Sequence, residues 1–216
     1  MTDRAPPIPA RAQAGKPARN RRLALRLTLW ALLGVPAWFM IRSLAQGEAL
    51  AMDLLHPSGE TALRLMILAM LPGPLADIFG RAPLLRAWLA ARRNLGVAAF
   101  GYAALHLVFY IIDMGALGPM LDELTLPGIW TGWLSFIALL AAASISSNAM
   151  MRRFGRWWKR IQRGVYAAVL LGALHWWLLD RNYVPALIHL APLLLAWCAR
   201  LAMRYRHSTP RKERPA

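Results

Sequence analysis

The sequence contains a single cysteine, Cys198, among its 216 residues. An internal disulfide is therefore excluded, and so is covalent cofactor attachment through a C-x-x-C-H motif, which needs two cysteines. The sequence also lacks an internal repeat, a glycine-rich phosphate loop, a Ser-His-Asp order and a pair of carboxylates at catalytic spacing. Any chemistry must then come from other polar groups.

Charged residues are scarce, at 17% of the chain, whereas 58% of the residues are hydrophobic and mean hydropathy is positive. This balance is typical of a polytopic membrane protein. Acidic residues are the scarcer kind, since 26 Lys and Arg outnumber 10 Asp and Glu. A nucleic-acid-binding face would lie beside an ordinary core, but here the basic residues lie between apolar segments. We therefore expect a lipid bilayer, and no nucleic acid, as a partner.

Six apolar segments approach the length of about 20 residues that crosses a hydrocarbon core of about 30 Å. The sequence therefore predicts an all-α, polytopic membrane bundle of six transmembrane helices over residues 27–203. Residues 1–26 and 204–216 are predicted to form basic cytoplasmic tails, the first disordered. A cleaved signal peptide is the alternative for the first segment, but Arg42 interrupts its apolar run and favours a retained helix. The segments are 27–45, 61–79, 95–112, 129–147, 164–179 and 184–199.

The distribution of charge predicts the orientation. All but three of the 26 basic residues lie in the two tails or in the second and fourth loops. The alternate loops hold seven of the ten acidic residues. Because basic loops stay on the cytoplasmic side, both termini are predicted to be cytoplasmic.

Two histidines, His106 and His175, lie inside predicted membrane segments, where polar groups are costly and usually functional. Both segments enter from the cytoplasm, so their depths can be compared. His106 follows Arg93 by ~20 Å along its helix, and His175 follows Arg163 by ~18 Å. Two imidazoles at one level on separate helices can ligate both axial positions of a haem iron. The alternative is that each only hydrogen-bonds across helices, a contact worth about 1–2 kcal/mol.

Three other polar residues need an interpretation. His189, in the sixth segment, lies in the same outer half and is a possible alternative ligand. His56 is expected in the first periplasmic loop, with a surface or turn role. Gln162 precedes His175 by thirteen residues, which places it about 140° around an ideal helix, so the two are not expected to pair.

Four stretches of the sequence form a specific pattern: HPSGETALRLMILAMLPGPLA, RRNLGVAAFGYAALHLVFY, IWTGWLSFIALLAAASISSNAMMRRFGRWWKRIQRGVY and ALHWWLLDRN. In order and spacing they resemble the MsrQ (formerly YedZ) family, the haem-binding membrane subunits of the bacterial protein-methionine-sulfoxide reductase system. That family belongs to the ferric-reductase-like transmembrane group. The resemblance covers about residues 55–182.

The resemblance implies a b-type cytochrome in the bacterial inner membrane, with haem b held by His106 and His175. It implies electrons drawn from the quinone pool or from a cytoplasmic flavin, and passed to a periplasmic molybdopterin subunit that reduces methionine sulfoxide. FMN is implied by the resemblance alone. Residues 157–160 are candidate quinone or flavin contacts, although Trp and basic residues at an interface are ordinarily topology anchors.

Gln162 departs from the family pattern, which often has a histidine at this position. An amide is a poor iron ligand compared with imidazole, so we expect one haem and regard Gln162 only as the position of a weak second site. Two alternatives stay open: a cytochrome that serves another acceptor, such as a metal reductase, and a cofactor-free permease or assembly factor.

Overall fold

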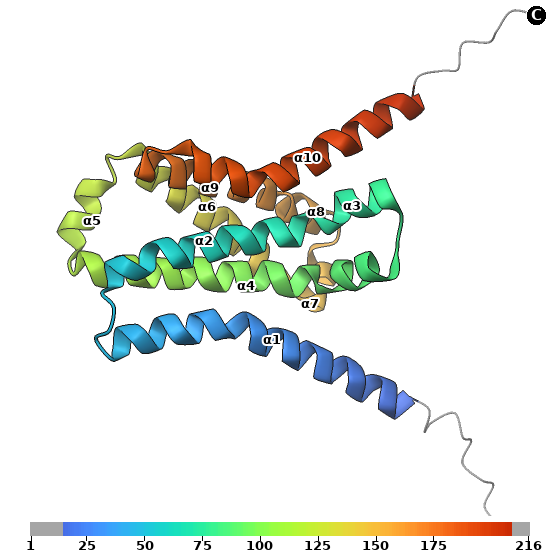
Figure 1. Ribbon diagram of the computed structural model, residues 1–216, viewed down its shortest axis with the longest axis horizontal. Helices are drawn as coiled ribbons and strands as arrows, with labels where there is room; N and C mark the ends of the chain where they lie inside the picture. The colour runs from blue at the N-terminus through green and yellow to red at the C-terminus, as the bar shows by residue number, and fades with distance from the viewer. Residues whose placement is uncertain (1–14, 209–216) are drawn as a thin grey trace, which may run out of the picture. The chain divides into compact units, whose positions relative to one another are not determined.

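The computed structural model describes residues 15–208, and within these the chain is helical with no strand, which confirms the predicted all-α class. The chain divides into two units, residues 1–42 and 43–216, which are described separately. The helices are α1 Gly15–Ala45, α2 Ala51–Met70, α3 Pro72–Phe79, α4 Pro83–Met114, α5 Leu117–Glu123, α6 Pro127–Ser144, α7 Asn148–Phe154, α8 Arg156–Gln162, α9 Gly164–Asp180 and α10 Tyr183–Ser208 (Figure 1).

The first unit is formed by α1, a 31-residue helix whose last turn extends past the unit boundary. The helix begins at Gly15, so the expected disorder of residues 15–26 is wrong. Most residues of that stretch are Ala, Leu or Arg, which are strong helix formers. Residues 1–14 of the expected tail lie outside the described residues.

The second unit is a bundle in which α2 packs along α4 and α6 packs along α9 (Figure 1). The two pairs meet through contacts of α4 with α6 and of α2 with α9, while α10 packs against α9 and α3. Small residues let the helices approach closely, since Ala99 and Ala168 have no exposed surface. Ser135 of α6 donates a hydrogen bond to the Ala168 carbonyl oxygen of α9 at 2.8 Å, so a buried hydroxyl is satisfied across the helix pair.

Five stretches of the described residues are long and apolar enough to cross a membrane. The fifth of the six predicted segments corresponds to α9, which has 17 residues and is about 25 Å long. Only Arg163 separates it from α8, and the Arg163 backbone is right-handed helical, at φ −68° and ψ −19°. The helical path into α9 is therefore longer than α9 itself, and the count of six crossings stays a prediction. The five stretches are Leu23–Ala45, Ala51–Phe79, Pro83–Met114, Pro127–Ser144 and Tyr183–Arg206.

Two predicted boundaries differ from the structure. α2 begins at Ala51, so His56 lies inside a helix and its expected place in a loop is wrong. The start of α2 is stabilised by Asp53, whose carboxylate accepts a hydrogen bond from the Leu50 N–H at 2.9 Å. At the other end of the chain, α10 continues to Ser208, so residues 204–208 of the expected tail are helical, and residues 209–216 lie outside the described part.

Candidate functional site

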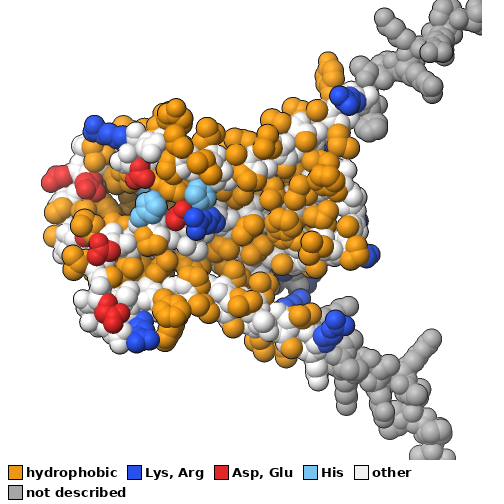
Figure 2. All heavy atoms as spheres, viewed as in Figure 1, with side chains coloured by type: hydrophobic (Ala, Val, Ile, Leu, Met, Phe, Trp, Pro, Cys, Tyr) orange, Lys and Arg blue, Asp and Glu red, His pale blue; other side chains and the backbone are white. Residues whose placement is uncertain are grey.

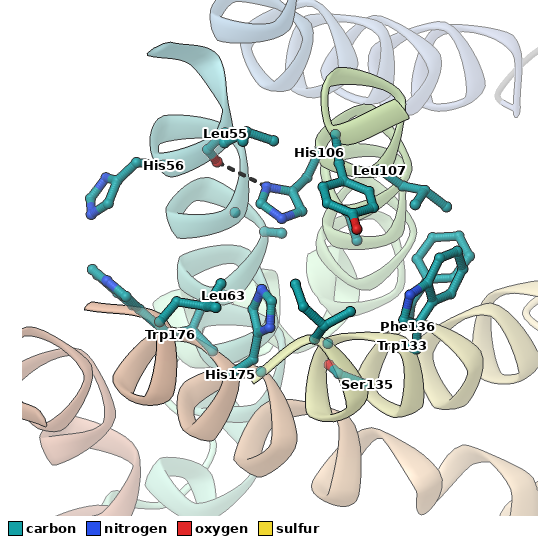
Figure 3. A pocket seen from close by; sticks show the side chains of 18 of the residues that line it. Leu55, His56, Leu63, His106, Leu107, Trp133, Ser135, Phe136, His175 and Trp176 are labelled. Carbon is teal, nitrogen blue, oxygen red and sulfur yellow. Dashed lines mark hydrogen bonds between the residues drawn. The ribbon is translucent and has the colours of Figure 1, made fainter. Parts of the chain in front are cut away.

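A cavity of about 480 Å³ lies among α2, α4, α6 and α9. Its wall is mostly aliphatic and aromatic, with residues such as Leu63, Leu107, Trp133 and Phe136 (Figure 3). This volume and this lining are typical of a site for a small molecule or cofactor, which usually occupies about 300–1,000 Å³.

His106 of α4 and His175 of α9 both line this cavity. Their ring centroids are 6.1 Å apart, and the ring planes are nearly perpendicular, at 89°. Figure 3 shows the two rings entering the same space from different helices. The structure thus brings together the two histidines that the depth comparison placed at one level.

The Nδ1 atom of each imidazole ring is hydrogen-bonded to a backbone carbonyl oxygen. His106 Nδ1 lies 2.9 Å from the Leu55 carbonyl oxygen, and His175 Nδ1 lies 2.7 Å from that of Gly128. A carbonyl oxygen can only accept, so Nδ1 carries the proton in both rings and Nε2 keeps its lone pair. A metal-binding histidine is usually oriented in this way, with its second nitrogen donating to a carbonyl or carboxylate.

Ser58 is a second hydrogen-bonding group beside the His106 ring. Its hydroxyl donates within α2, to the carbonyl oxygens of Leu54 at 2.7 Å and Leu55 at 2.9 Å. The Ser58 oxygen therefore accepts from His106 Nδ1, at 3.2 Å. Because the Ser58 side chain is fully buried, it holds the ring without admitting water.

Two glycines make room for the rings. A Cβ atom on Gly59 of α2 would lie 3.1 Å from His106 Nδ1, and one on Gly132 of α6 would lie 2.6 Å from His175 Nδ1. Each imidazole therefore packs directly against the backbone of the helix that faces it. Sequence reasoning missed both glycines, although each stands in a stretch that carries the family pattern, HPSGE and WTGW.

His106 and His175 alone suit an iron that is already bound by a porphyrin. No group of three or more His, Cys, Asp or Glu side chains that could hold a metal ion occurs in residues 15–208. A bare ion would therefore find too few protein ligands here. Two imidazole–metal bonds of about 2 Å each, together with the distance from each nitrogen to its ring centre, come to roughly 6 Å, close to the observed separation. A porphyrin-bound iron between two histidines meets both conditions.

His189 does not line this cavity. Its Nε2 accepts a hydrogen bond from Arg64 Nε at 3.0 Å and lies 3.2 Å from a carboxylate oxygen of Glu60. Its Nδ1 donates to the Pro185 carbonyl oxygen at 2.8 Å. Both ring nitrogens are engaged, which argues against His189 as an alternative ligand.

Gln162 lies apart from the histidine pair, as its position on the helix predicts. Its amide nitrogen donates to the Ala142 carbonyl oxygen at 2.9 Å and lies 3.3 Å from the Ser146 hydroxyl. The side chain therefore ties the end of α8 to the end of α6. In the adjacent belt, Trp158 donates to the Ile145 carbonyl oxygen and the Arg160 guanidinium lies over the Trp157 ring, as expected of anchoring residues.

One end of the cavity is acidic. Asp113, Glu123 and Asp180 all contribute to its lining. Two aromatic side chains are tied to these carboxylates, because the Tyr110 hydroxyl donates to Glu123 at 2.8 Å and the Trp176 indole N–H donates to Asp180 at 2.6 Å. An acidic rim with fixed aromatic side chains therefore surrounds this end.

We expect Gly132→Ala to destabilise the protein by about 1–3 kcal/mol, because the added methyl group must displace the His175 ring or the α6 backbone. Gly101→Ala in α4 is the matched control, since a Cβ there meets nothing within 4 Å. Alanine favours a helix over glycine by up to about 1 kcal/mol, so the control should be neutral or stabilising. Unfolding in mixed detergent micelles measures both, and equal stability of the two variants would contradict the close packing of His175.

Residues 58–173 match the family model described as "Ferric reductase like transmembrane component", which is more than half of the chain. The protein-methionine-sulfoxide reductase heme-binding subunit MsrQ of Xanthomonas campestris pv. campestris (strain 8004) is 33% identical over 193 residues, covering 86% of this chain and 87% of the relative. The subunit of the same name from Pectobacterium carotovorum subsp. carotovorum (strain PC1) is 34% identical over 179 residues, covering 77% of this chain and 82% of the relative. The chain belongs to the MsrQ family, within the ferric-reductase-like transmembrane proteins.

Proposed function

We propose that this protein is a membrane-bound b-type cytochrome subunit in which His106 and His175 are the axial ligands of one haem. The observation that carries the proposal is the paired geometry of the two rings. Their centroids are 6.1 Å apart, and each ring donates a hydrogen bond from Nδ1 to a backbone carbonyl oxygen. The relatives support it, since their name describes a heme-binding subunit.

When bound, the haem supplies a one-electron carrier. The chain's own residues orient the imidazoles, through the Leu55 and Gly128 carbonyl oxygens and the Ser58 hydroxyl. The apolar wall excludes water, and this burial together with the two imidazoles would set the potential of the bound haem. Neither histidine has to move or change tautomer for an electron to pass.

The electron acceptor that we propose is a periplasmic molybdopterin subunit that reduces methionine sulfoxide in oxidised proteins. The relatives' name supports a partnership with a methionine-sulfoxide reductase. The acidic end of the cavity, at Asp113, Glu123 and Asp180, is the natural place of exit, because charge complementarity steers a soluble redox partner. The donor is the quinone pool or a cytoplasmic flavin, and an FMN cofactor rests on family resemblance alone.

We also propose six crossings of the bacterial inner membrane with both termini in the cytoplasm. The distribution of basic residues supports this topology. Reporter enzymes that are active on only one side of the membrane, fused after residue 115, residue 155 and the C-terminus, test it. The fusion after residue 115 should report periplasm and the other two cytoplasm. A periplasmic report from the C-terminus would remove one crossing.

The haem assignment is tested by the visible spectrum of the purified chain. Dithionite reduction should shift the Soret band and produce an α-band. His106→Ala and His175→Ala should each lower haem content by more than about tenfold, since losing even a residue that orients a ligand costs about 10–100-fold in metal affinity.

His189→Ala is the control for this experiment, because His189 is intramembrane but bonded to Arg64 and Pro185. It should keep the spectrum. A wild-type protein without a reduced-minus-oxidised spectrum would favour the cofactor-free permease or assembly factor. A spectrum lost in His189→Ala but kept in one of the other variants would reassign that ligand.

Haem content per chain tests the number of sites. We expect one haem, and we expect Gln162→His to add none, because residue 162 contacts the end of α6 and does not face the cavity. Haem extraction and quantification against protein concentration measures this stoichiometry. A rise toward two haems in Gln162→His would show that an inner site exists and lacks only a ligand.

A further inference from the structure

A cluster of charged side chains interrupts the apolar surface of the bundle. His56, Glu60 and Arg64 follow one another on α2 at four-residue spacing, which places them along one face of the helix. His189 of α10 lies against the last two of them. We call Glu60, Arg64 and His189 the polar triad; Figure 2 shows acidic, basic and histidine side chains gathered on this face within a hydrophobic surface.

The polar triad is held together by short contacts. One Arg64 Nη atom donates to Glu60 at 2.6 Å, and Arg64 Nε donates to His189 Nε2 at 3.0 Å. His189 Nδ1 donates to the Pro185 carbonyl oxygen and Nε2 accepts from Arg64, while Nε2 also lies 3.2 Å from a Glu60 carboxylate oxygen. The remaining guanidinium N–H groups of Arg64 have no acceptor among the described residues.

The polar triad opens outward. The Arg64 side chain is 54% exposed, whereas Glu60 and His189 are about one-fifth exposed. Apolar side chains surround it on both helices, with Leu68 at 41%, Leu187 at 50% and Ile188 at 63% exposure. Among apolar side chains on a membrane helix, an arginine is costly unless it is paired. Glu60 and His189 offset that cost but leave donors unused.

The polar triad shares a wall with the histidine cavity. Glu60 lines the cavity, and so does Trp176, whose ring centroid is 5.1 Å from that of His189. Trp176 also directly follows His175 in the chain. A ligand at the triad would therefore lie on the lipid side of the same wall that encloses His106 and His175.

Resting on the electron-transfer function proposed above, we infer that the polar triad binds the head group of a membrane quinone or hydroquinone. Such a ligand reaches the site through the bilayer, and its apolar tail suits the flanking leucine and isoleucine side chains. A ring oxygen accepts from the unused Arg64 donors, and a hydroquinone hydroxyl donates to the Glu60 carboxylate. Among the two candidate donors, this site favours the quinone pool over a cytoplasmic flavin.

The inner belt at residues 157–160 is the competing location. There the Trp158 indole N–H is already bonded to the Ile145 carbonyl oxygen, and the Arg160 guanidinium lies 4.6 Å from the Trp157 ring centroid. Each of these side chains has a partner within the belt or in residue 145, and none of them lines the histidine cavity. The polar triad is therefore the better site for a lipid-phase reductant.

The test is direct binding of decylubiquinone, a short-chain quinone, to the full-length haem-loaded protein in phosphatidylcholine nanodiscs. Quenching of tryptophan fluorescence reports binding. The double variant Glu60→Gln/Arg64→Gln removes both charges together, so no unpaired ion is left behind. We expect it to weaken binding by at least about tenfold, which corresponds to losing one or two hydrogen bonds to charged groups. Arg160→Gln tests the competing inner belt, and on this inference it should bind like the wild type.

Arg64→Lys is the second variant, because lysine keeps the positive charge beside Glu60 but lacks the planar guanidinium group with its several N–H donors. It should weaken binding several-fold. Unchanged binding in both variants, or binding lost only in Arg160→Gln, would overturn the inference. Loss of decylubiquinone binding when the nanodiscs are made with phosphatidylglycerol would identify the ligand as an anionic lipid head group. That result would also overturn the inference. A wild type without a haem spectrum refutes the proposed function, whereas an intact spectrum with unchanged quinone binding refutes only the site.

Discussion

The second unit is organised around two imidazole rings that press against glycine backbone. His106 and His175 each reach across a helix pair, α4 to α2 and α9 to α6, and each donates its Nδ1 proton to a carbonyl oxygen of the opposite element. In an apolar interior such a hydrogen bond fixes the tautomer and direction of the ring at the same time. The two helix pairs must then be held at the spacing that these contacts require, which is why Gly59 and Gly132 carry no side chain.

Two other polar side chains of the bundle are satisfied inside the protein. Ser135 bonds to the α9 backbone and Gln162 to the α6 backbone, so each adds a cross-link between helices without leaving a free donor in the apolar interior. The polar triad differs, because the Arg64 side chain is half exposed and keeps unused donors. Charged residues within membrane helices usually have a function, and ligand binding is the function that we propose for Arg64.

The pairing of His106 and His175 was predictable because helical rise converts sequence distance from a basic loop into depth. The glycines were not, since which backbone faces a ring is set by packing between helices that are distant in the sequence. His56 was misplaced because HPSGE has the composition of a turn, yet Pro57 lies inside α2. The role of His189 also needed tertiary structure, because its partner Arg64 lies 125 residues away on another helix.

In the proposed cytochrome, His106 and His175 would hold the haem iron and would leave it no free position for a substrate, so electrons would enter and leave through the surroundings of the haem. The wall of the cavity then decides which molecules can exchange electrons with it. The acidic end, with Asp113 and Asp180, suits a soluble partner, while the Trp176 wall meets the polar triad and the lipid phase. In this proposal, entry from the bilayer and exit to an aqueous partner use different walls of one cavity, and neither requires the imidazoles to move.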